Sequence, residues 1–427
     1  MLFFSAILLQ QFQVTQIHAI FRGMTLLLSP ASQLKRNIML LLLALLSPRP
    51  LSAQSLDMQI NPSLPDNANA SVELLSGPGS VKDFSGYTVW LDSQIHEKSI
   101  PGVAMAIVRS GSVLDIQTWG VRTLDGAERV DSETVFRIAS VSKTFAGTVA
   151  AKLVQHQQQE WDTPLVTVLP QYVIGTGPET KEITLRHVLS HTTGLMPHAY
   201  SNMLDSGVAY EKIQEMFQEI PTVCPPGRCY GYQNVVFSLV SDVVEVTTHK
   251  SYEEYVQQEL FEPLGMRTAS VGLEGYTDNA NVSSAHQPVR DSWRVATLNP
   301  AYYSVGPAAG VNASIEDMIL WAQANLGAFP QVLPKDLLSQ QHSPVVETPR
   351  GNYFNRWPRL EKAWYGLGWR VFDYAGVRIV HHGGGVRGFR SEMVLVPELD
   401  IAMVVMFNAE TPVANEVVPM FLDAILN

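Results

Sequence analysis

Apolar residues cluster in short runs near both ends of the chain, and these runs predict β-strands. Residues 103–108 and 113–121 are strand-like and are separated by the turn Arg109-Ser110-Gly111-Ser112, which predicts a hairpin. Near the other end, residues 377–380, 392–396 and 401–407 predict three more strands, the last two joined by a turn at residues 397–400. Strands are therefore expected at both ends of the folded chain.

Helical spacing dominates the segments between these strands. Residues 143–155 predict one helix, a second is expected after the capping box formed by Ser251 and Glu254, and a third runs from Ser314 to residue 326. Residues 413–426 have helical spacing too. The pattern predicts an α/β (α+β) fold, in which an antiparallel sheet built from both chain ends is flanked by helices and a mostly helical lobe is inserted in the middle.

The N-terminal 53 residues differ in composition from the rest, because they are rich in Leu and contain basic residues but no Asp or Glu. Lys35 and Arg36 precede an apolar run at 38–46, and small residues follow at 52–53, which predicts an export signal and a periplasmic or secreted protein. Translation from Met24 is the simplest account of the apolar patch before it. Arg49, close behind the run, leaves an uncleaved membrane anchor open as an alternative. We expect residues 54–82 to be a flexible lead-in and residues 83–427 to form the enzyme domain.

Composition narrows the function class. The formal charge is −11 and no basic stripe occurs, which argues against binding of nucleic acid. A hydrophobic content of 46% over 427 residues is enough for a large buried core. Cys224 and Cys229, the two cysteines of the chain, are close enough to form a disulfide in an oxidising compartment, although two unpaired small side chains remain the alternative.

The candidate chemistry begins at Ser140 and Lys143, which are one helical turn apart and so share a face. A serine hydroxyl becomes a nucleophile when a base takes its proton, and a desolvated lysine of lowered pKa can do so. The spacing alone is weak, because Ser32 and Lys35 repeat it within the predicted export signal.

Two further motifs make the pattern specific. Tyr232-x-Asn234 supplies a phenol that can carry a proton and an amide that can hold a carbonyl oxygen. His382-Gly383-Gly384-Gly385 lies on or opens a strand, where glycines would let a substrate approach the backbone.

With these motifs in this order, residues 85–425 resemble the serine beta-lactamase and penicillin-binding protein superfamily, in its class C beta-lactamase-related branch. Residues 183–195, 262–266 and 309–311 also match that family's pattern. The resemblance implies that Ser140 is acylated, that Lys143 and Tyr232 transfer protons, and that the choice between them as the acylation base is open. It also implies that Asn234 orients the substrate carbonyl and that the N–H groups of Ser140 and Gly385 form an oxyanion hole, with His382 and Gly384 in the substrate-binding strand.

The third motif departs from the lysine-containing form of the best-known members. His382 is mostly neutral at pH 7, so carboxylate-bearing substrates should bind less well, and an esterase becomes a stronger candidate. Arg387 and Arg390 could supply the missing charge, but the alternative is that both face solvent.

We expect no cofactor and no metal. His187 and His191 are four residues apart but lack the glutamate of the zinc protease motif, and His381 should point away from His382 on a strand. Tyr302, Tyr303 and Trp369 are more typical of a core than of a pocket.

The leading hypothesis is thus a serine hydrolase that cleaves a beta-lactam, a D-alanyl peptide or an ester. A non-hydrolytic penicillin-binding or sensor domain and a structural envelope protein are the alternatives. The expected partner is a small molecule or a short peptide, with membrane contact only through the export signal or anchor, and the oligomeric state stays open.

Overall fold

A computed structural model describes residues 83–349 and 354–426 of the chain. The predicted export signal (1–53) and lead-in (54–82) lie outside the described residues. The described fold begins with helix α3 (Ser85–Glu97). The domain boundary expected at residue 83 stays a prediction.

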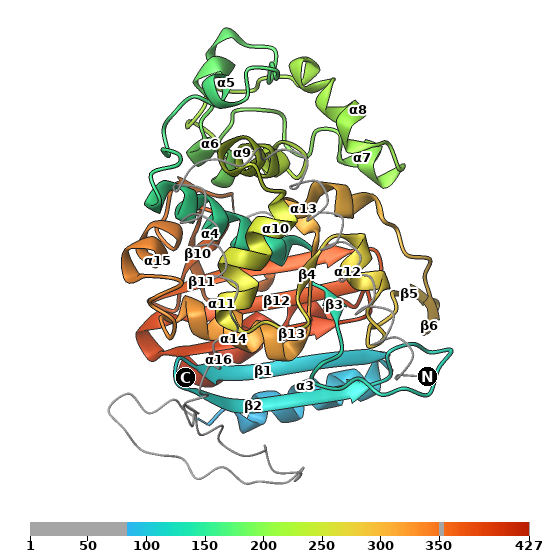
Figure 1. The fold of residues 1–427 in the computed structure, drawn as a ribbon. Helices are drawn as coiled ribbons and strands as arrows, with labels where there is room; N and C mark the ends of the chain where they lie inside the picture. Colours follow the sequence, from blue (N-terminus) through green and yellow to red (C-terminus); the bar gives the residue numbers. More distant parts are fainter. Residues whose placement is uncertain (1–82, 350–353, 427) are drawn as a thin grey trace, which may run out of the picture. The chain divides into compact units, whose positions relative to one another are not determined.

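The largest sheet in the described part of the chain has eight strands and is antiparallel (Figure 1). In order across the sheet, the strands are β2 (Ser112–Gly120), β1 (Gly102–Arg109), β13 (Ile401–Phe407), β12 (Phe389–Val396), β11 (Val377–Val386), β10 (Arg370–Tyr374), β9 (Leu360–Tyr365) and β8 (Val346–Glu347). The N-terminal strand β1 pairs with the C-terminal strand β13, from Val103 opposite Phe407 to Val108 opposite Ala402. The predicted sheet from both chain ends is confirmed.

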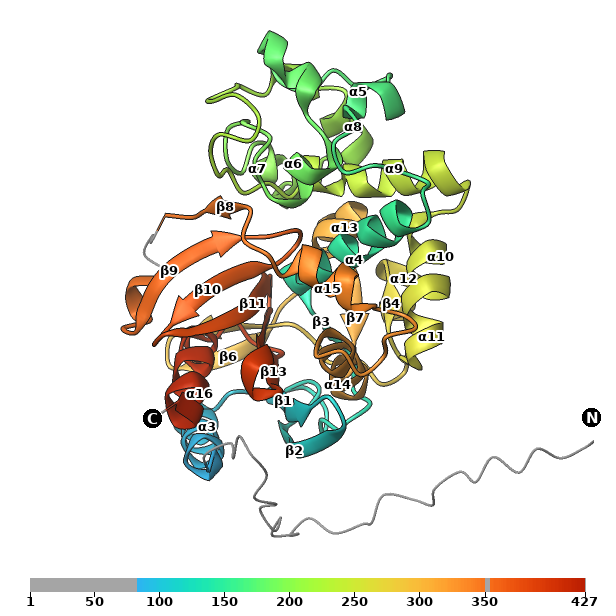
Figure 2. The same ribbon diagram turned by 90° about the vertical axis from the view of Figure 1, so that its left-hand side faces the viewer.

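Both faces of the central strands are buried, because helices cover the sheet on both sides. Along β1, Val103, Met105 and Ile107 face a cluster that includes α3 and α16 (Val417–Leu426), and the residues between them face the opposite cluster. This alternation is the two-residue period of a strand. Figure 2 shows α3 and α16 on one side of β1 and β13, with α14 (Ile315–Asn325) on the other.

Most of the remaining helices belong to the segment inserted between β2 and β8, as the sequence predicts. The helices of the lobe at the top of Figure 1 are α5 (Leu165–Val168), α6 (Leu185–Leu189), α7 (Ser201–Asp205), α8 (Tyr210–Gln214) and α9 (Leu239–Thr248). The helices closer to the sheet are α4 (Ser142–Gln155), α10 (Tyr252–Val256), α11 (Glu262–Leu264), α12 (Leu273–Thr277), α13 (Gly306–Ala309) and α15 (Lys335–Gln341). Short strands form two small sheets, one of β3 (Phe136–Arg137), β7 (Val311–Ala313) and β4 (Ser270–Val271), the other of β5 (His286–Val289) and β6 (Ser292–Val295).

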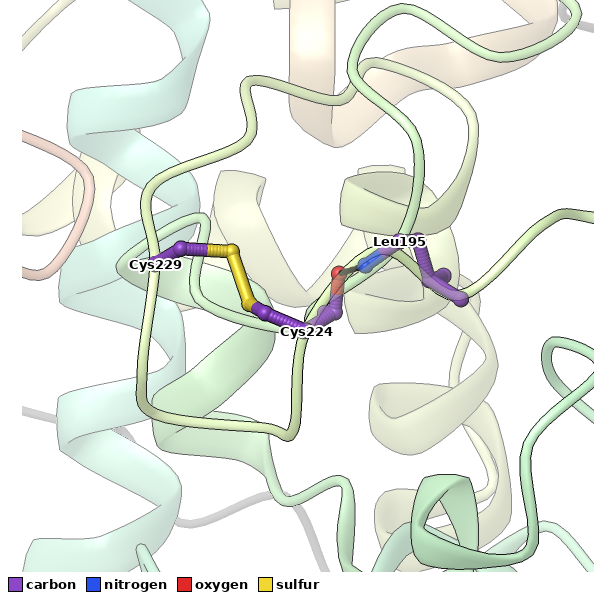
Figure 3. The surroundings of a disulfide bond; sticks show 4 residues. Leu195, Cys224 and Cys229 are labelled. Atoms are coloured by element: carbon purple, nitrogen blue, oxygen red, sulfur yellow. Dashed lines mark hydrogen bonds between the residues drawn. A yellow bond between two sulfur atoms is a disulfide. The ribbon is translucent and has the colours of Figure 1, made fainter.

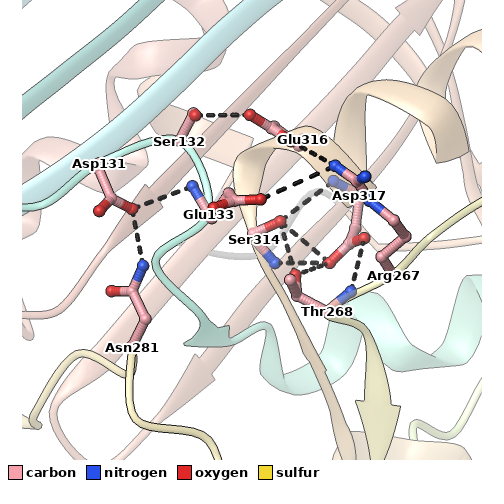
Figure 4. A network of polar contacts seen from close by, with 9 residues as sticks. All are labelled: Asp131, Ser132, Glu133, Arg267, Thr268, Asn281, Ser314, Glu316 and Asp317. Carbon is pink, nitrogen blue, oxygen red and sulfur yellow. Dashed lines mark hydrogen bonds and ion pairs between the residues drawn. The ribbon is translucent and has the colours of Figure 1, made fainter.

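The predicted helix starts agree with the structure. The Ser251 and Glu254 capping box opens α10, and Ser314 caps α14 with Asp317 as its reciprocal partner. Thr268 supports this second cap, because its hydroxyl donates to Asp317 Oδ2 and its backbone N–H donates to Asp317 Oδ1 at 3.3 Å (Figure 4). At the C-terminus the predicted helix is interrupted, because residues 412–415 form a 3-10 turn and α16 begins at Val417.

Within residues 83–349 and 354–426, no helix combines the length and the apolar character that crossing a bilayer requires.

Candidate active site

Ser140 lies on a single 3-10 turn (Ala139–Val141) between β3 and α4. Ala139, directly before it, has a φ of 50°, a left-handed conformation that is unfavourable for a residue with a Cβ atom. The residues on either side are buried, whereas Ser140 is half-buried. The strained turn therefore places the Ser140 hydroxyl at the N-terminus of α4, where it has access to solvent.

Lys143 follows on the first turn of α4, and its side chain is completely buried. Its Nζ donates to Asn234 Oδ1 at 2.7 Å and to the carbonyl oxygen of Ala308, in α13, at 3.0 Å. The distance from Nζ to Ser140 Oγ is 3.4 Å. A neutral amine has two N–H groups and one lone pair, so these two acceptors leave the lone pair for the Ser140 hydroxyl.

Tyr232 and Asn234 come to Ser140 on a segment that is held from behind by His191. Gly231 N–H donates to the His191 carbonyl oxygen at 2.8 Å, and Gln233 N–H donates to His191 Nδ1 at 3.2 Å. The His191 ring packs on that of Tyr232, with centroids 4.3 Å apart. The buried imidazole thus sets the position of the Tyr232 side chain.

The pKa values of Lys143 and Tyr232 differ from those of exposed side chains. Burial, helped by the positive charge of Arg370, holds the pKa of Lys143 well below its usual value. Burial raises the pKa of Tyr232, although the charge of Arg370 and a hydrogen bond with Ser140 act in the opposite direction. The arrangement favours a neutral amine and a neutral phenol on either side of the Ser140 hydroxyl.

The glycine strand of the third motif, in β11, lies directly against the turn that carries Ser140. A Cβ atom on Gly384 would be 2.2 Å from the Ile138 carbonyl oxygen and 3.2 Å from the Cβ of Ala139. Ser391 Oγ, opposite Gly384 on β12, donates to the same Ile138 oxygen at 2.6 Å. The absent side chain of Gly384 makes room for the protein's own backbone, while Gly385, one residue further, is exposed.

His382 is brought to this region but presents no exposed side-chain surface. Its Nδ1 lies 2.9 Å from the Gly383 carbonyl oxygen and so carries the proton, which leaves Nε2 to accept from the Tyr365 hydroxyl at 2.9 Å. Burial, reinforced by the charges of Arg370 and Lys143, holds the pKa of His382 well below its usual value. The side chain is a neutral, fully occupied imidazole.

Among residues 83–349 and 354–426, no group of three or more His, Cys, Asp and Glu side chains could hold a metal ion. His381 points away from His382, as expected, and its Nε2 lies 2.7 Å from the buried carboxylate of Glu392. His187 takes part in the cap of α6 with Thr184, whereas His191 packs against Tyr232.

The segment that leads to Tyr232 is closed by a disulfide between Cys224 and Cys229, so the predicted pairing is confirmed (Figure 3). Cys224 N–H donates to the Gly194 carbonyl oxygen at 3.3 Å, and Gly227 N–H donates to the Thr192 carbonyl oxygen at 2.7 Å. The disulfide loop is thereby bonded to the turn that follows His191. The loop ends at Cys229, three residues before Tyr232.

Comparison with known proteins assigns this arrangement to a family. The family model described as beta-lactamase matches residues 88–425, most of the chain. The chain belongs to the beta-lactamase family. This confirms the relationship to serine beta-lactamases and penicillin-binding proteins that the motifs around Ser140 predict.

Individual members of the beta-lactamase family resemble the chain at low identity. An unguisins hydrolase of Aspergillus campestris is 28% identical over 72% of this chain, which spans 58% of the length of that relative. A beta-lactamase of Escherichia coli is 23% identical over 80% of this chain and 93% of its own length. The octameric penicillin-binding protein homologue from Pyrococcus abyssi has the same fold, with a TM-score of 0.69 at 21% identity over 81% of this chain and 77% of that one.

Several residues around Ser140 were not predicted from the motifs of the beta-lactamase family. Arg370 and Tyr365 lie at the ends of β10 and β9, two strands that the hydrophobic pattern did not indicate, and Ala308 contributes a backbone oxygen that no side-chain pattern can reveal.

Arg387 and Arg390 are exposed, and the Arg390 guanidinium lies against Gly385. Tyr303 and Trp369 are buried core residues, as expected, and Tyr302 is half-buried.

Proposed function

We propose that this chain is a serine hydrolase that acts through an acyl-enzyme on Ser140. The observation that carries the proposal is the set of contacts of the Lys143 amine. Two acceptors, Asn234 Oδ1 and Ala308 O, occupy its N–H groups and Ser140 Oγ lies 3.4 Å from the same nitrogen. Family membership and relatives named as hydrolases support the same chemistry.

In the acylation step, Ser140 Oγ attacks the carbonyl carbon of the substrate and its proton passes to the Lys143 amine. Tyr232, which keeps its proton at neutral pH, then donates to the leaving nitrogen or oxygen as its bond to the carbonyl carbon breaks, and regains a proton from the Lys143 ammonium. Lys143 thus acts as the base and Tyr232 as the relay, because the raised pKa keeps Tyr232 protonated, so that it holds a proton to donate and offers no phenolate to accept one.

The negative charge that develops on the carbonyl oxygen is stabilised, in this proposal, by the N–H groups of Ser140 and Gly385. One such donor lowers the activation free energy by about 2.7 to 4 kcal/mol. The support is that β11 lies against the Ser140 turn at Gly384 and leaves Gly385 exposed. Water then attacks the acyl carbon and gives a proton to the Lys143 amine, the bond to Ser140 Oγ breaks, and that proton passes to the serine oxygen.

The substrate is a beta-lactam or a related amide or ester, with D-alanyl peptides and carboxylic esters as the alternatives. Mass spectrometry of the intact protein tests all three classes, because the mass gained and its lifetime report both acylation and hydrolysis. Ser140→Ala should abolish the added mass while the thermal unfolding midpoint is retained. Labelling that persists in this variant would show that a residue other than Ser140 is the nucleophile.

A non-hydrolytic penicillin-binding or sensor domain is the alternative from another class. Burst kinetics with a chromogenic beta-lactam and a p-nitrophenyl ester distinguish the two. A stoichiometric burst followed by turnover supports the hydrolase, whereas a burst with no steady state would refute it and support the sensor.

We also propose that the protein is exported, to the periplasm or the exterior, as the pattern in residues 1–53 predicts. The Cys224–Cys229 disulfide supports this proposal, because disulfides persist in oxidising compartments. Sequencing of the N-terminus of the native protein is the test, and an unprocessed chain recovered from the cytoplasm would contradict it.

A further inference from the structure

Arg370 brings a cation to the proposed active site from a strand that none of the three motifs includes. It is the first residue of β10 and follows the turn Gly366-Leu367-Gly368-Trp369. Its Cζ is 5.7 Å from the centre of the Tyr232 ring and 5.5 Å from that of Tyr365. The guanidinium therefore lies within the length of a small substrate from the Tyr232 hydroxyl and its partner Ser140.

The turn before Arg370 is fixed to the same helix as Lys143. Gly368 has a φ of 82°, and a Cβ atom there would be 2.4 Å from the Lys143 carbonyl oxygen. Gly368 N–H donates to the Leu189 carbonyl oxygen, at the end of α6, at 3.0 Å. Because the turn is held by α4 on one side and α6 on the other, the backbone of Arg370 has a defined position relative to Ser140.

Positive charge dominates the electrostatic environment of this region. Besides burial, the charges of neighbouring cations, Lys143 and Arg370 among them, lower the pKa of His191 and of His382. The charge of Arg370 also helps to lower the pKa of Lys143, and it opposes the rise in the pKa of Tyr232. Within the described part of the chain, no carboxylate is among the groups that shift these four side chains, although the protein as a whole has a formal charge of −11.

We propose that Arg370 binds a carboxylate of the substrate, and so takes the place of the cation that the third motif lacks. This inference rests on the proposed hydrolase function and adds the substrate class, an acyl compound that bears a carboxylate near its scissile bond. A guanidinium suits this role because it presents a planar pair of donors that match a carboxylate and stays charged at any physiological pH.

The other candidates for this role are worse placed. His382 is buried, neutral and bonded at both ring nitrogens. Arg390, on β12, lies against Gly385, and its charge is not among the causes that shift the pKa of Lys143 or Tyr232. Arg387 is exposed and lies in the connection between β11 and β12.

The test compares two esters that differ only in a carboxylate, one with the acid and one with its neutral amide, at a pH on the activity plateau. For Arg370→Met, the ratio of kcat/KM on the acid to kcat/KM on the amide should fall about 10- to 100-fold, the size of one hydrogen-bonded charge contact. Arg370→Lys should restore part of the ratio, because it restores the charge without the planar fork. Arg387→Met is the matched control, and its ratio should equal that of the unmodified protein.

The outcomes separate this inference from the function on which it rests. If the unmodified protein hydrolyses both esters and Arg370→Met lowers both rates equally, Arg370 is a structural residue and the inference is wrong while the hydrolase stands. If neither ester acylates Ser140 in the unmodified protein, the proposed function itself fails. An equal loss of the ratio in Arg387→Met would assign the contact to the β11–β12 connection and overturn the inference as well.

Discussion

Replacing Arg370 by Met should also move the acid limb of the pH–rate profile, because the positive charge of Arg370 disfavours protonation of Lys143. Lys143 Nζ is 4.7 Å and Arg370 Cζ is 5.7 Å from the centre of the same Tyr232 ring, so the two cations are at most about 10 Å apart. At that separation, two unit charges repel by about 0.4 kcal/mol at the dielectric constant of water and about 1.6 kcal/mol at an effective value of 20. The repulsion corresponds to about 0.3 to 1.2 pKa units.

The sign follows from the role of Lys143 as a base. The amine must be neutral to accept the Ser140 proton, so activity rises as pH rises through the pKa of Lys143. Without Arg370 the ammonium form is less disfavoured, the pKa of Lys143 rises, and the limb should move to higher pH by about 0.3 to 1.2 units. On the limb itself, this shift lowers the rate by up to about 15-fold at constant pH.

The assay is kcat/KM on a neutral p-nitrophenyl ester at intervals between pH 5 and pH 9, so that the substrate does not titrate. Arg387→Met serves as the control, because that side chain is exposed and lies in another connection of the sheet. A limb that stays in place, or that moves to lower pH, would refute the view that Arg370 keeps Lys143 neutral. A shift of equal size in the control would show that only the overall charge matters.

Three further predictions concern stability. Gly384→Ala should lower the free energy of unfolding by about 1 to 3 kcal/mol, because its Cβ would overlap the Ile138 carbonyl. Gly385→Ala is the control and should cost less, because its Cβ meets the movable end of the Arg390 side chain. Thermal melts of the two variants check this. Replacing both Cys224 and Cys229 by Ser should lower the unfolding free energy by about 2 kcal/mol in urea titrations, and an unchanged midpoint would contradict a constraining role for the loop. Burial holds the pKa values of His191, His381 and His382 below their usual value near 6.5, so the contribution of these three side chains to the free energy of unfolding should be constant above that pH and fall as the pH drops below it. Equal urea midpoints at pH 7.5 and 5.5 would exclude this contribution.

The parts of the fold that the sequence predicted are those governed by local pattern. The hairpin of β1 and β2, the strands β11 to β13 and the caps of α10 and α14 follow from alternation, turn residues and capping boxes within short windows. Strands β9 and β10 were missed, because Leu360–Tyr365 and Arg370–Tyr374 mix charged and aromatic residues and show no clean alternation.

The residues of the site likewise fall into those that short sequence patterns reveal and those that they do not. Ser140, Lys143, Tyr232 and Asn234 were predicted from two short motifs, from the order of the motifs along the chain and from the family that they resemble, and the structure brings all four together. Ala308 and Arg370 were not found, because they reach Lys143 and Tyr232 only through the packing of segments more than 100 residues away along the chain. A backbone oxygen and a single arginine on a strand leave no pattern in the sequence, so only the three-dimensional arrangement identifies them.

The pairing of β1 with β13 has a consequence for how the protein reaches its active form. These two adjacent strands of the sheet are far apart in the sequence, since Val103 of β1 pairs with Phe407 of β13. Contacts between such distant segments form slowly and cannot form before the later segment has been synthesised. The sheet that supports Ser140 therefore closes only after β13 has been synthesised, and until then the edge of β1 that pairs with β13 has no partner strand.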